Sequence, residues 1–159
     1  MRQIYLIRHA KAQAIAASDK ARELAPQGVD DSAKLGRLFN DDFVQPEAII
    51  CSDSKRTRQT LEIMSANGLS CATIDFDEGL YHASSSYLSD LIENNVAKTV
   101  MIIGHNPSLA ILLNELAPAD MIAPDLMHFP TGTIACLQIN DEATTHNMEL
   151  KAFVKGANL

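Results

Sequence analysis

The sequence of 159 residues is marked first by what it lacks. No apolar run approaches the roughly 18 residues that a membrane-spanning helix needs. The N-terminus has neither the apolar core nor the small-residue cleavage site of a secretory signal peptide, so we expect a cytoplasmic location and no membrane partner. Internal repeats, low-complexity tracts and linkers are also missing, and we therefore expect one domain over residues 1–159.

Cysteine is scarce, and acidic residues outnumber basic ones. Cys51, Cys71 and Cys136 are widely spaced, without the close pairs of zinc sites, and we interpret them as buried or half-buried free thiols. The formal net charge of −7 argues against nucleic acid as a partner. Many of the basic residues nevertheless fall in two short segments, which predict one local positive pocket for a small anion if the segments meet. These residues are Arg8, Lys11, Lys20, Arg22, Lys55, Arg56 and Arg58.

Apolar runs alternate with helical patterns along the chain, which is typical of an α/β fold. Apolar stripes at i, i+3 and i+4 predict helices around residues 35–39, 57–64, 88–92 and 109–116. We interpret residues 10–26 and 118–132 as long loops, which in a compact domain are more often functional than idle. Strands are predicted at residues 3–8, 47–51, 71–75 and 98–103, and at 133–139 and 148–154 as an antiparallel pair.

The segment 4–12 carries the most chemical information. Its apolar residues 4–7 form a strand-like run that ends at Arg8 and His9. In an α/β protein such a strand end faces a crevice at the carboxyl edge of the sheet. The arginine supplies a fixed positive charge, and the histidine supplies a nitrogen that can act as a nucleophile or base near neutral pH. The pair therefore suits attack on a phosphorus atom.

Two further strand ends carry the same kinds of side chain. The second predicted strand leads through Ser52 into a helix start that contains Arg56, and the fourth ends just before His105. Parallel strands bring such ends to one edge, where helix N-termini also favour a phosphate. A lone histidine or arginine at such a strand end is more often structural than functional. Three strand ends that carry these side chains one after another predict a shared anion site.

The motifs that carry this pattern extend along much of the chain. They are Arg8-His9-Ala10-Lys11-Ala12, Ser18-Asp19-x-x-Arg22-x-Leu24-x-x-x-Gly28, Ser52-x-x-x-Arg56-x-x-Gln59-Thr60, Leu80-Tyr81, Gly104-His105-Asn106-Pro107 and Phe129-Pro130-Thr131-Gly132. Together they resemble the histidine phosphatase superfamily, and within it the SixA-type phosphohistidine phosphatases, over about residues 1–139. The resemblance implies the phosphoglycerate mutase-like fold, a three-layer α/β/α sandwich with a mostly parallel central sheet.

The resemblance also implies a mechanism. His9 is the expected nucleophile and becomes a phosphohistidine that water then hydrolyses. For this His9 must be neutral at the attacking nitrogen, and its other ring nitrogen should donate to a backbone carbonyl. Arg8 and Arg56 would hold the non-bridging oxygens, and His105 would add a donor, best when protonated. No metal or cofactor is expected, because these groups already neutralise the phosphoryl charge.

Six further residues are candidates for substrate binding, because they could cover or wall the pocket. For Asn106 the favoured interpretation is a cap of the following helix. We expect Ser52 to order the turn that places Arg56. The six candidates are Lys11, Asp19, Arg22, Asn106, Thr131 and Gly132.

One departure from the family concerns the proton donor. Many members carry a Glu or Asp general acid after the third strand, and here that position aligns with Gly79. Glu78 or His82 could substitute, or no residue acts as the acid. An alkoxide leaving group needs a proton, whereas protonated phosphohistidine departs as neutral imidazole with a pKa of about 6.5. The missing acid therefore favours phosphohistidine as the substrate.

The expected function is a monomeric phosphatase that acts on phosphohistidine in a partner protein. Two alternatives stay open on the same residues: a phosphatase for small phosphorylated metabolites, and a module that binds phosphoryl groups without turning them over. A cysteine phosphatase is disfavoured, because the spacing from Cys51 to Arg56 is shorter than the Cys loop of those enzymes requires.

Overall fold

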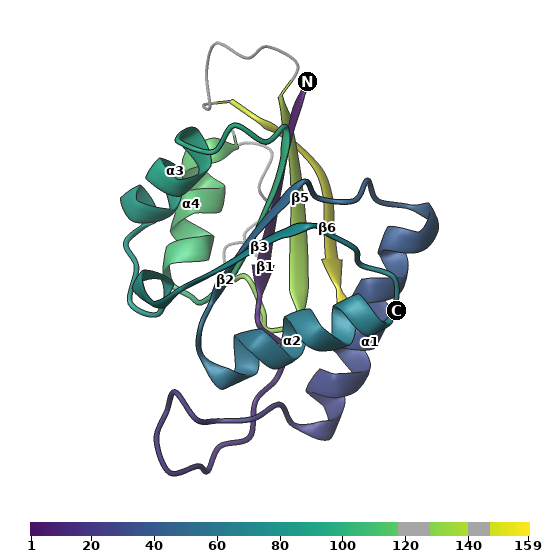
Figure 1. The fold of residues 1–159 in the computed structure, drawn as a ribbon, viewed down its shortest axis with the longest axis vertical. Coiled ribbons are helices and arrows are strands. Elements are labelled where there is room, and N and C mark those ends of the chain that lie inside the picture. The colour runs from purple at the N-terminus through teal and green to yellow at the C-terminus, as the bar shows by residue number, and fades with distance from the viewer. Residues whose placement is uncertain (118–127, 140–146) are drawn as a thin grey trace.

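The computed structural model describes residues 1–117, 128–139 and 147–159, and it places a central sheet between two layers of helices (Figure 1). The strands are β1 (Arg2–Arg8), β2 (Ala48–Ser52), β3 (Thr73–Asp77), β4 (Thr99–Gly104), β5 (Thr133–Ile139) and β6 (Glu149–Lys155). The helices are α1 (Pro26–Asp41), α2 (Lys55–Ala66), α3 (Ser85–Glu93) and α4 (Ser108–Leu116), with 3-10 turns at Glu78–Leu80 and Gly156–Asn158. Within the described residues, none of the helices combines the length and apolarity needed to cross a membrane.

The six strands form one sheet in the order β3-β2-β4-β1-β5-β6. Neighbours from β3 to β1 pair in parallel, whereas β5 runs antiparallel to both β1 and β6. The three-layer α/β/α class, the mostly parallel sheet and the closing antiparallel pair are thereby confirmed.

Each face of the sheet has its own apolar core, because the central strands are covered on both sides. Residues 4–7 of β1 and 100–103 of β4 are completely buried, as their continuous apolar runs predict. In both strands the even-numbered residues pack with α3 and α4, and the odd-numbered residues pack with α1 and α2.

Close contact between α1 and α2 fixes the helix that carries Arg56. A Cβ atom at Gly36 in α1 would lie 2.5 Å from the carbonyl oxygen of Met64 in α2, so this position requires glycine. The tight packing sets the height of α2 on the sheet, and with it the position of its first turn.

The edge strand β3 departs most from the sequence-based expectation. It was predicted at residues 71–75 and lies at Thr73–Asp77, whereas the other strands fall within one residue of their predicted bounds. At the edge of the sheet Ile74 and Phe76 are 38% and 46% exposed. Because β3 is not covered on both faces, its sequence lacks the continuous apolar run that marks the central strands. The predicted loop at 10–26 is confirmed up to Ala25, since α1 begins at Pro26, and it contains an isolated bridge between Ala12 and Leu24. The predicted loop at 118–132 lies partly outside the described residues.

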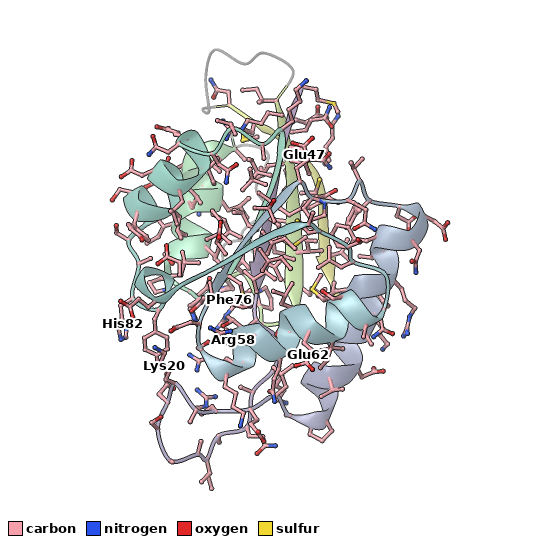
Figure 2. The ribbon with its side chains drawn as sticks, viewed as in Figure 1. Lys20, Glu47, Arg58, Glu62, Phe76 and His82 are labelled. Atoms are coloured by element: carbon pink, nitrogen blue, oxygen red, sulfur yellow. The ribbon has the colours of Figure 1, made fainter. Side chains whose placement is uncertain are left out.

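The register of the parallel strands brings three strand ends to one height. Arg8 at the end of β1 pairs with Gly104 at the end of β4, and Cys51 in β2 pairs with Ile103. The residues that follow these strands therefore emerge side by side at the carboxyl edge. Figure 2 shows Lys20 and His82 at this end of the molecule, with Glu47 at the opposite end.

Candidate active site

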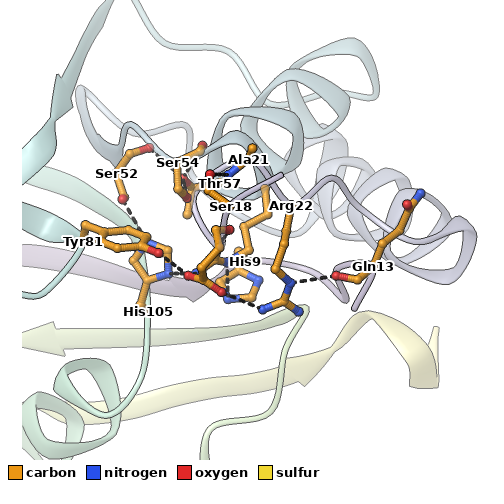
Figure 3. Close-up of polar contacts among 12 residues, drawn as sticks. His9, Gln13, Ser18, Ala21, Arg22, Ser52, Ser54, Thr57, Tyr81 and His105 are labelled. Carbon is orange, nitrogen blue, oxygen red and sulfur yellow. Dashed lines mark hydrogen bonds and ion pairs between the residues drawn. The ribbon is translucent and has the colours of Figure 1, made fainter. Parts of the chain in front are cut away.

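Four side chains predicted to share one site lie together at the carboxyl edge of the sheet. Arg8 and His9 come from the end of β1, Arg56 from the first turn of α2, and His105 from the residue after β4. His9 and His105 have ring centroids 5.3 Å apart, and the Arg56 side chain lies within hydrogen-bond distance of both rings. We call these four residues the His9 cluster; Figure 3 shows both rings of the histidine pair.

His9 is held in the tautomer that a nucleophile needs. Its Nδ1 lies 2.8 Å from the carbonyl oxygen of Ala10, which can only accept, so Nδ1 carries the proton, as predicted. Nε2 accepts from Nε of Arg56 at 3.3 Å and is therefore unprotonated. Burial above all, together with the charges of His105 and the two arginines, lowers the pKa of His9 to about 3.

His105 presents its own unprotonated nitrogen to Arg56. The guanidinium has no acceptor, so its Nη2 donates to Nδ1 of His105 at 3.5 Å, and Nε2 of His105 carries the proton and donates to Oγ of Ser52 at 2.8 Å. Burial lowers the pKa of His105 to about 4, with Arg56 as the second cause, while the charge of Asp19 opposes the shift. His105 is thus neutral in the free site, and a bound anion would favour its protonation.

Hydroxyl groups around the start of α2 set the position of Arg56. Oγ1 of Thr57 donates to the carbonyl oxygen of Ser52 at 2.6 Å, which supports the expected role of Ser52 in ordering this turn. Oγ1 of Thr60 accepts from the backbone N–H of Ala10 at 3.1 Å and joins the α2 start to the segment after β1. The Ser52 hydroxyl contact with His105 was not anticipated from the sequence.

Arg8 is oriented by a strained residue of the segment before β5. Its Nη1 donates to the carbonyl oxygen of Phe129 at 3.1 Å, and Phe129 has a positive φ of 40°. Such a conformation costs a non-glycine residue about 1–3 kcal/mol and is commonest at functional sites. Burial and the charge of Arg56 lower the pKa of Arg8, which stays charged.

Asn106 supports the same segment and does not cap α4. Its Nδ2 donates to the carbonyl oxygens of His128 and Phe129 at 2.8 and 3.1 Å. The N-cap position of α4 is occupied by Pro107 without a side-chain hydrogen bond, so the capping interpretation is wrong. The amide is engaged by backbone carbonyls of a segment distant in sequence, which local spacing cannot predict.

Three candidates from the loop before α1 lie in different surroundings. Asp19 forms ion pairs with Arg56 and with Arg22, and the distance to Arg22 is 3.1 Å. Arg22 also donates through Nε to the carbonyl oxygen of Gln13 at 2.7 Å (Figure 3). Lys11 is exposed, and its ammonium donates to Gln27 at 3.4 Å. Asp19 and Arg22 are therefore joined to the His9 cluster, whereas the Lys11 side chain contacts the start of α1.

The remaining two candidates form part of the backbone beside His9. Gly132 has a positive φ of 65°, which suits glycine, and its N–H donates to the carbonyl oxygen of His9 at 3.0 Å. Thr131 precedes it and is half-buried. This turn therefore packs against the backbone of His9, and contact of Thr131 or Gly132 with a substrate stays a prediction.

Tyr81 belongs to the site, although the sequence reasoning assigned it no role. Its ring stands edge-on to His105 with a centroid distance of 5.3 Å, and Arg56 lies 5.6 Å from the ring centroid. Its hydroxyl donates to the Asp19 carboxylate (Figure 3). The signal that could have identified it was its place in the Leu80-Tyr81 motif, at the end of the 3-10 turn that follows β3.

Glu78 and His82, the two proposed substitutes for a general acid, are both exposed. Glu78 is exposed and lines a hollow between β3 and α3 that contains no member of the His9 cluster. At Gly79 a Cβ atom would lie 2.7 Å from the Tyr87 hydroxyl, which occupies the space a side chain there would need. His82 is exposed beside Tyr81, with ring centroids 4.4 Å apart.

The arrangement can bind and polarise a phosphoryl group. Two arginines and two neutral histidines offer charge-assisted donors and an unprotonated imidazole nitrogen, in largely water-excluded surroundings. Among the described residues, no group of three His, Cys, Asp or Glu side chains is arranged to hold a metal ion. Fold and site together define an α/β protein with a positively charged centre, suited to an oxyanion, at the carboxyl edge of its sheet.

Comparison with known sequences places this centre in a family. The family described as "Histidine phosphatase superfamily (branch 1)" matches residues 4–84. The chain is 31% identical over 157 residues to the phosphohistidine phosphatase SixA of Escherichia coli strain K12, with 93% of this chain and 92% of that protein covered. The chain belongs to the histidine phosphatase superfamily, as the sequence motifs predicted.

Solved structures share the fold. A protein histidine phosphatase SixA complexed with tungstate matches with a TM-score of 0.83 at 24% identity, and 98% of each chain is covered. The alpha-ribazole phosphatase of Shigella flexneri matches with a TM-score of 0.62 at 16% identity, covering 93% of this chain and 95% of that one. The same architecture is thus found in proteins named for a phosphoprotein and for a small phosphate ester.

Proposed function

We propose that this protein is a phosphatase that transfers a phosphoryl group from phosphohistidine of a partner protein to His9 and then to water. The observation that carries the proposal is the state of His9: Nδ1 donates to a backbone carbonyl, and the free electron pair of Nε2 faces Arg56. A neutral imidazole fixed in this tautomer is a competent nucleophile at neutral pH.

The proposed reaction has two displacements at phosphorus. In the first, Nε2 of His9 forms a bond to phosphorus while the bond to the substrate imidazole breaks and the protonated leaving group departs as neutral imidazole. In the second, water attacks phosphorus, the bond to His9 breaks, and inorganic phosphate is released with its proton passing to solvent. Arg8 and Arg56 hold the non-bridging oxygens in both steps, and His105 donates once the anion has raised its pKa.

The leaving group distinguishes this proposal from hydrolysis of phosphate esters. Among the residues that the structure describes, the carboxylate bonded to the His9 cluster is that of Asp19, and the hydrogen bonds from Tyr81 and then Arg22 hold its pKa well below the usual range. It is therefore ionised and is no proton donor. An imidazole leaving group tolerates this, whereas an alkoxide does not. The name of the E. coli relative agrees with this substrate class.

The test is a substrate panel measured beside a His9→Ala control. We expect the highest kcat/KM with a histidine-phosphorylated protein, measurable turnover of N-phosphoimidazole, and much slower hydrolysis of phosphomonoesters. Preference for a phosphomonoester would favour the small-molecule alternative. The S. flexneri alpha-ribazole phosphatase, whose fold this chain shares, is named for such a substrate. Absence of turnover on every substrate would favour a phosphoryl-binding module.

A thiol nucleophile is tested separately. Cys51 is completely buried, its thiol donates to the carbonyl oxygen of Ser52 at 3.3 Å, and burial raises its pKa to about 12. Such a thiol forms almost no thiolate at neutral pH. A Cys51→Ser variant should therefore keep its activity, and loss of activity in a folded variant would contradict the assignment to His9.

A further inference from the structure

We propose that Asp19 is a positioning residue that fixes the plane of the Arg56 guanidinium, so that one edge of that group is presented to the phosphoryl group. The inference rests on the proposed function and gives Asp19 a role other than substrate contact. It follows from how the donors of Arg56 are divided between two sides.

A guanidinium has two forked edges, a side edge formed by Nε and Nη2 and an end edge formed by Nη1 and Nη2. The side edge of Arg56 faces His9 and His105, at 3.3 and 3.5 Å. These contacts are long and go to neutral nitrogens, so two phosphoryl oxygens can replace them with shorter, charge-assisted bonds. The side edge is therefore the one available to substrate.

The end edge of Arg56 is occupied by a single residue. Nη1 donates to the backbone carbonyl oxygen of Asp19 at 2.8 Å, and Nη2 donates to its carboxylate Oδ2 at 3.2 Å. Two acceptors from one residue determine both the position and the rotation of the planar group. Asp19 does not compete with the phosphoryl group, because it uses the end edge and leaves the side edge open.

Asp19 can act in this way because it is itself held, both within its own loop and from the segment after β3. Its Oδ1 accepts from Nη1 of Arg22 at 3.1 Å, and its Oδ2 accepts from the hydroxyl of Tyr81. The backbone next to it is also fixed, since the carbonyl oxygen of Lys20 accepts from the N–H of Lys55 at 3.0 Å. The Asp19 side chain is 56% exposed, yet these contacts give it one orientation.

The charge of Asp19 gives the inference a distinctive kinetic consequence. Removing the carboxylate leaves the site with one more net positive charge, so a bound oxyanion should be held at least as tightly as before. The Arg56 fork, however, loses one of its two fixed points, and a misplacement of about 1 Å can cost about 100-fold in rate. Binding and turnover should therefore respond differently.

The experiment compares Asp19→Ala with Asp53→Ala. Asp53 forms an ion pair with Lys20 at 3.0 Å and so joins the same loop to the start of α2 without contacting Arg56. For each variant we would measure kcat with N-phosphoimidazole, the inhibition constant of tungstate and the thermal unfolding midpoint. We expect Asp19→Ala to lower kcat by about 10- to 100-fold with an unchanged or lower inhibition constant. Asp53→Ala should stay within about twofold of the unsubstituted protein in both quantities, since a partly exposed ion pair of this kind contributes little and Asp53 does not contact Arg56.

Two outcomes would overturn the inference. An unchanged kcat in Asp19→Ala would show that Arg56 needs no support, and a parallel loss of turnover and tungstate binding would show that the loop has simply lost its structure. An Asp19→Asn variant, which keeps an amide oxygen near Arg56, should give a kcat between those of Asp19→Ala and the unsubstituted protein. Failure of the proposed function would be seen differently, as absent turnover by the unsubstituted protein, and would overturn both proposals.

Discussion

The His9 cluster and the hollow between β3 and α3 differ in charge and in burial. The hollow has a volume of about 640 Å³, and its lining includes the carboxylates of Asp75, Asp77, Glu78 and Asp90 with no Lys or Arg. In the His9 cluster, His9, Arg56 and His105 are only 7%, 6% and 7% exposed and carry positive charge or unprotonated imidazole nitrogens. The acidic hollow would repel a phosphoryl group, whereas the positively charged cluster would attract it.

This difference shows that reactive side chains gathered at neighbouring strand ends identify the candidate site better than the volume of a cavity does. The cluster lies where three parallel strands end in register, and each of its side chains has a hydrogen-bond partner that orients it. The hollow lies beside the exposed edge strand β3, outside this convergence. Variants in the two regions should therefore have very different effects.

The largest expected effect is that of His9→Ala. Removal of the proposed nucleophile should lower kcat by about 10⁴-fold or more, on the scale seen for nucleophiles of other covalent enzymes. Turnover of N-phosphoimidazole and the thermal unfolding midpoint would be measured together, because the variant must remain folded. Substantial residual activity in a folded variant would show that another group attacks phosphorus.

The next effect concerns the guanidinium groups. Arg56→Ala or Arg8→Ala should cost several kcal/mol of transition-state stabilisation, or about 10²- to 10³-fold in kcat/KM, as for the loss of an oxyanion donor. Arg56→Lys should rescue little, because an ammonium cannot reproduce the forked geometry toward His9 and His105. Full activity in Arg56→Lys would reduce the role of Arg56 to charge alone.

A smaller effect should appear in the pH dependence of stability. Unfolded histidine has a pKa of about 6.5, whereas burial lowers the pKa of His9 to about 3 and that of His105 to about 4. The unfolded state therefore binds protons first as the pH falls, and each histidine should cost about 1.4 kcal/mol of stability per pH unit below 6.5. This loss of stability continues until the pH reaches the pKa of each histidine in the folded state.

Urea unfolding between pH 7.5 and 5 would measure this slope. A His105→Asn variant should lose its share of the slope, because asparagine does not titrate. An identical slope in variant and unsubstituted protein would mean that His105 is not buried in its neutral form.

The smallest effect is expected in the hollow. Asp90→Asn and Asp75→Asn should each change turnover of N-phosphoimidazole by less than about twofold, because surface substitutions away from a site have small effects. The measurement is the same steady-state assay with small substrate. A large loss of kcat in either variant would mean that the hollow contributes to chemistry and that the contrast drawn above is wrong.

The local apolar pattern was sufficient to predict the helices and strands and the four residues of the His9 cluster. The apolar runs that end at Arg8-His9 and at His105 predicted strand ends at one edge, and the parallel pairing of β1 with β4 places them there. The same pattern placed β3 two residues early, because an exposed edge strand has a weak apolar signal.

Contacts between distant segments were not predictable in the same way. The Asp19 carboxylate meets Tyr81 and Arg56, and the Asn106 amide reaches Phe129, through relations that only the assembled sheet creates. Spacing in the sequence carries no information on such partners, and for Asn106 it suggested a helix cap that does not form.

The central claim is tested most directly by trapping the covalent intermediate. The protein would be mixed with a ³²P-labelled phosphohistidine protein, quenched without acid because phosphohistidine is acid-labile, and digested to locate the label. The account predicts label on the peptide that contains His9 and none in His9→Ala. Label on another residue, or rapid turnover with no label on His9 at any time, would contradict it.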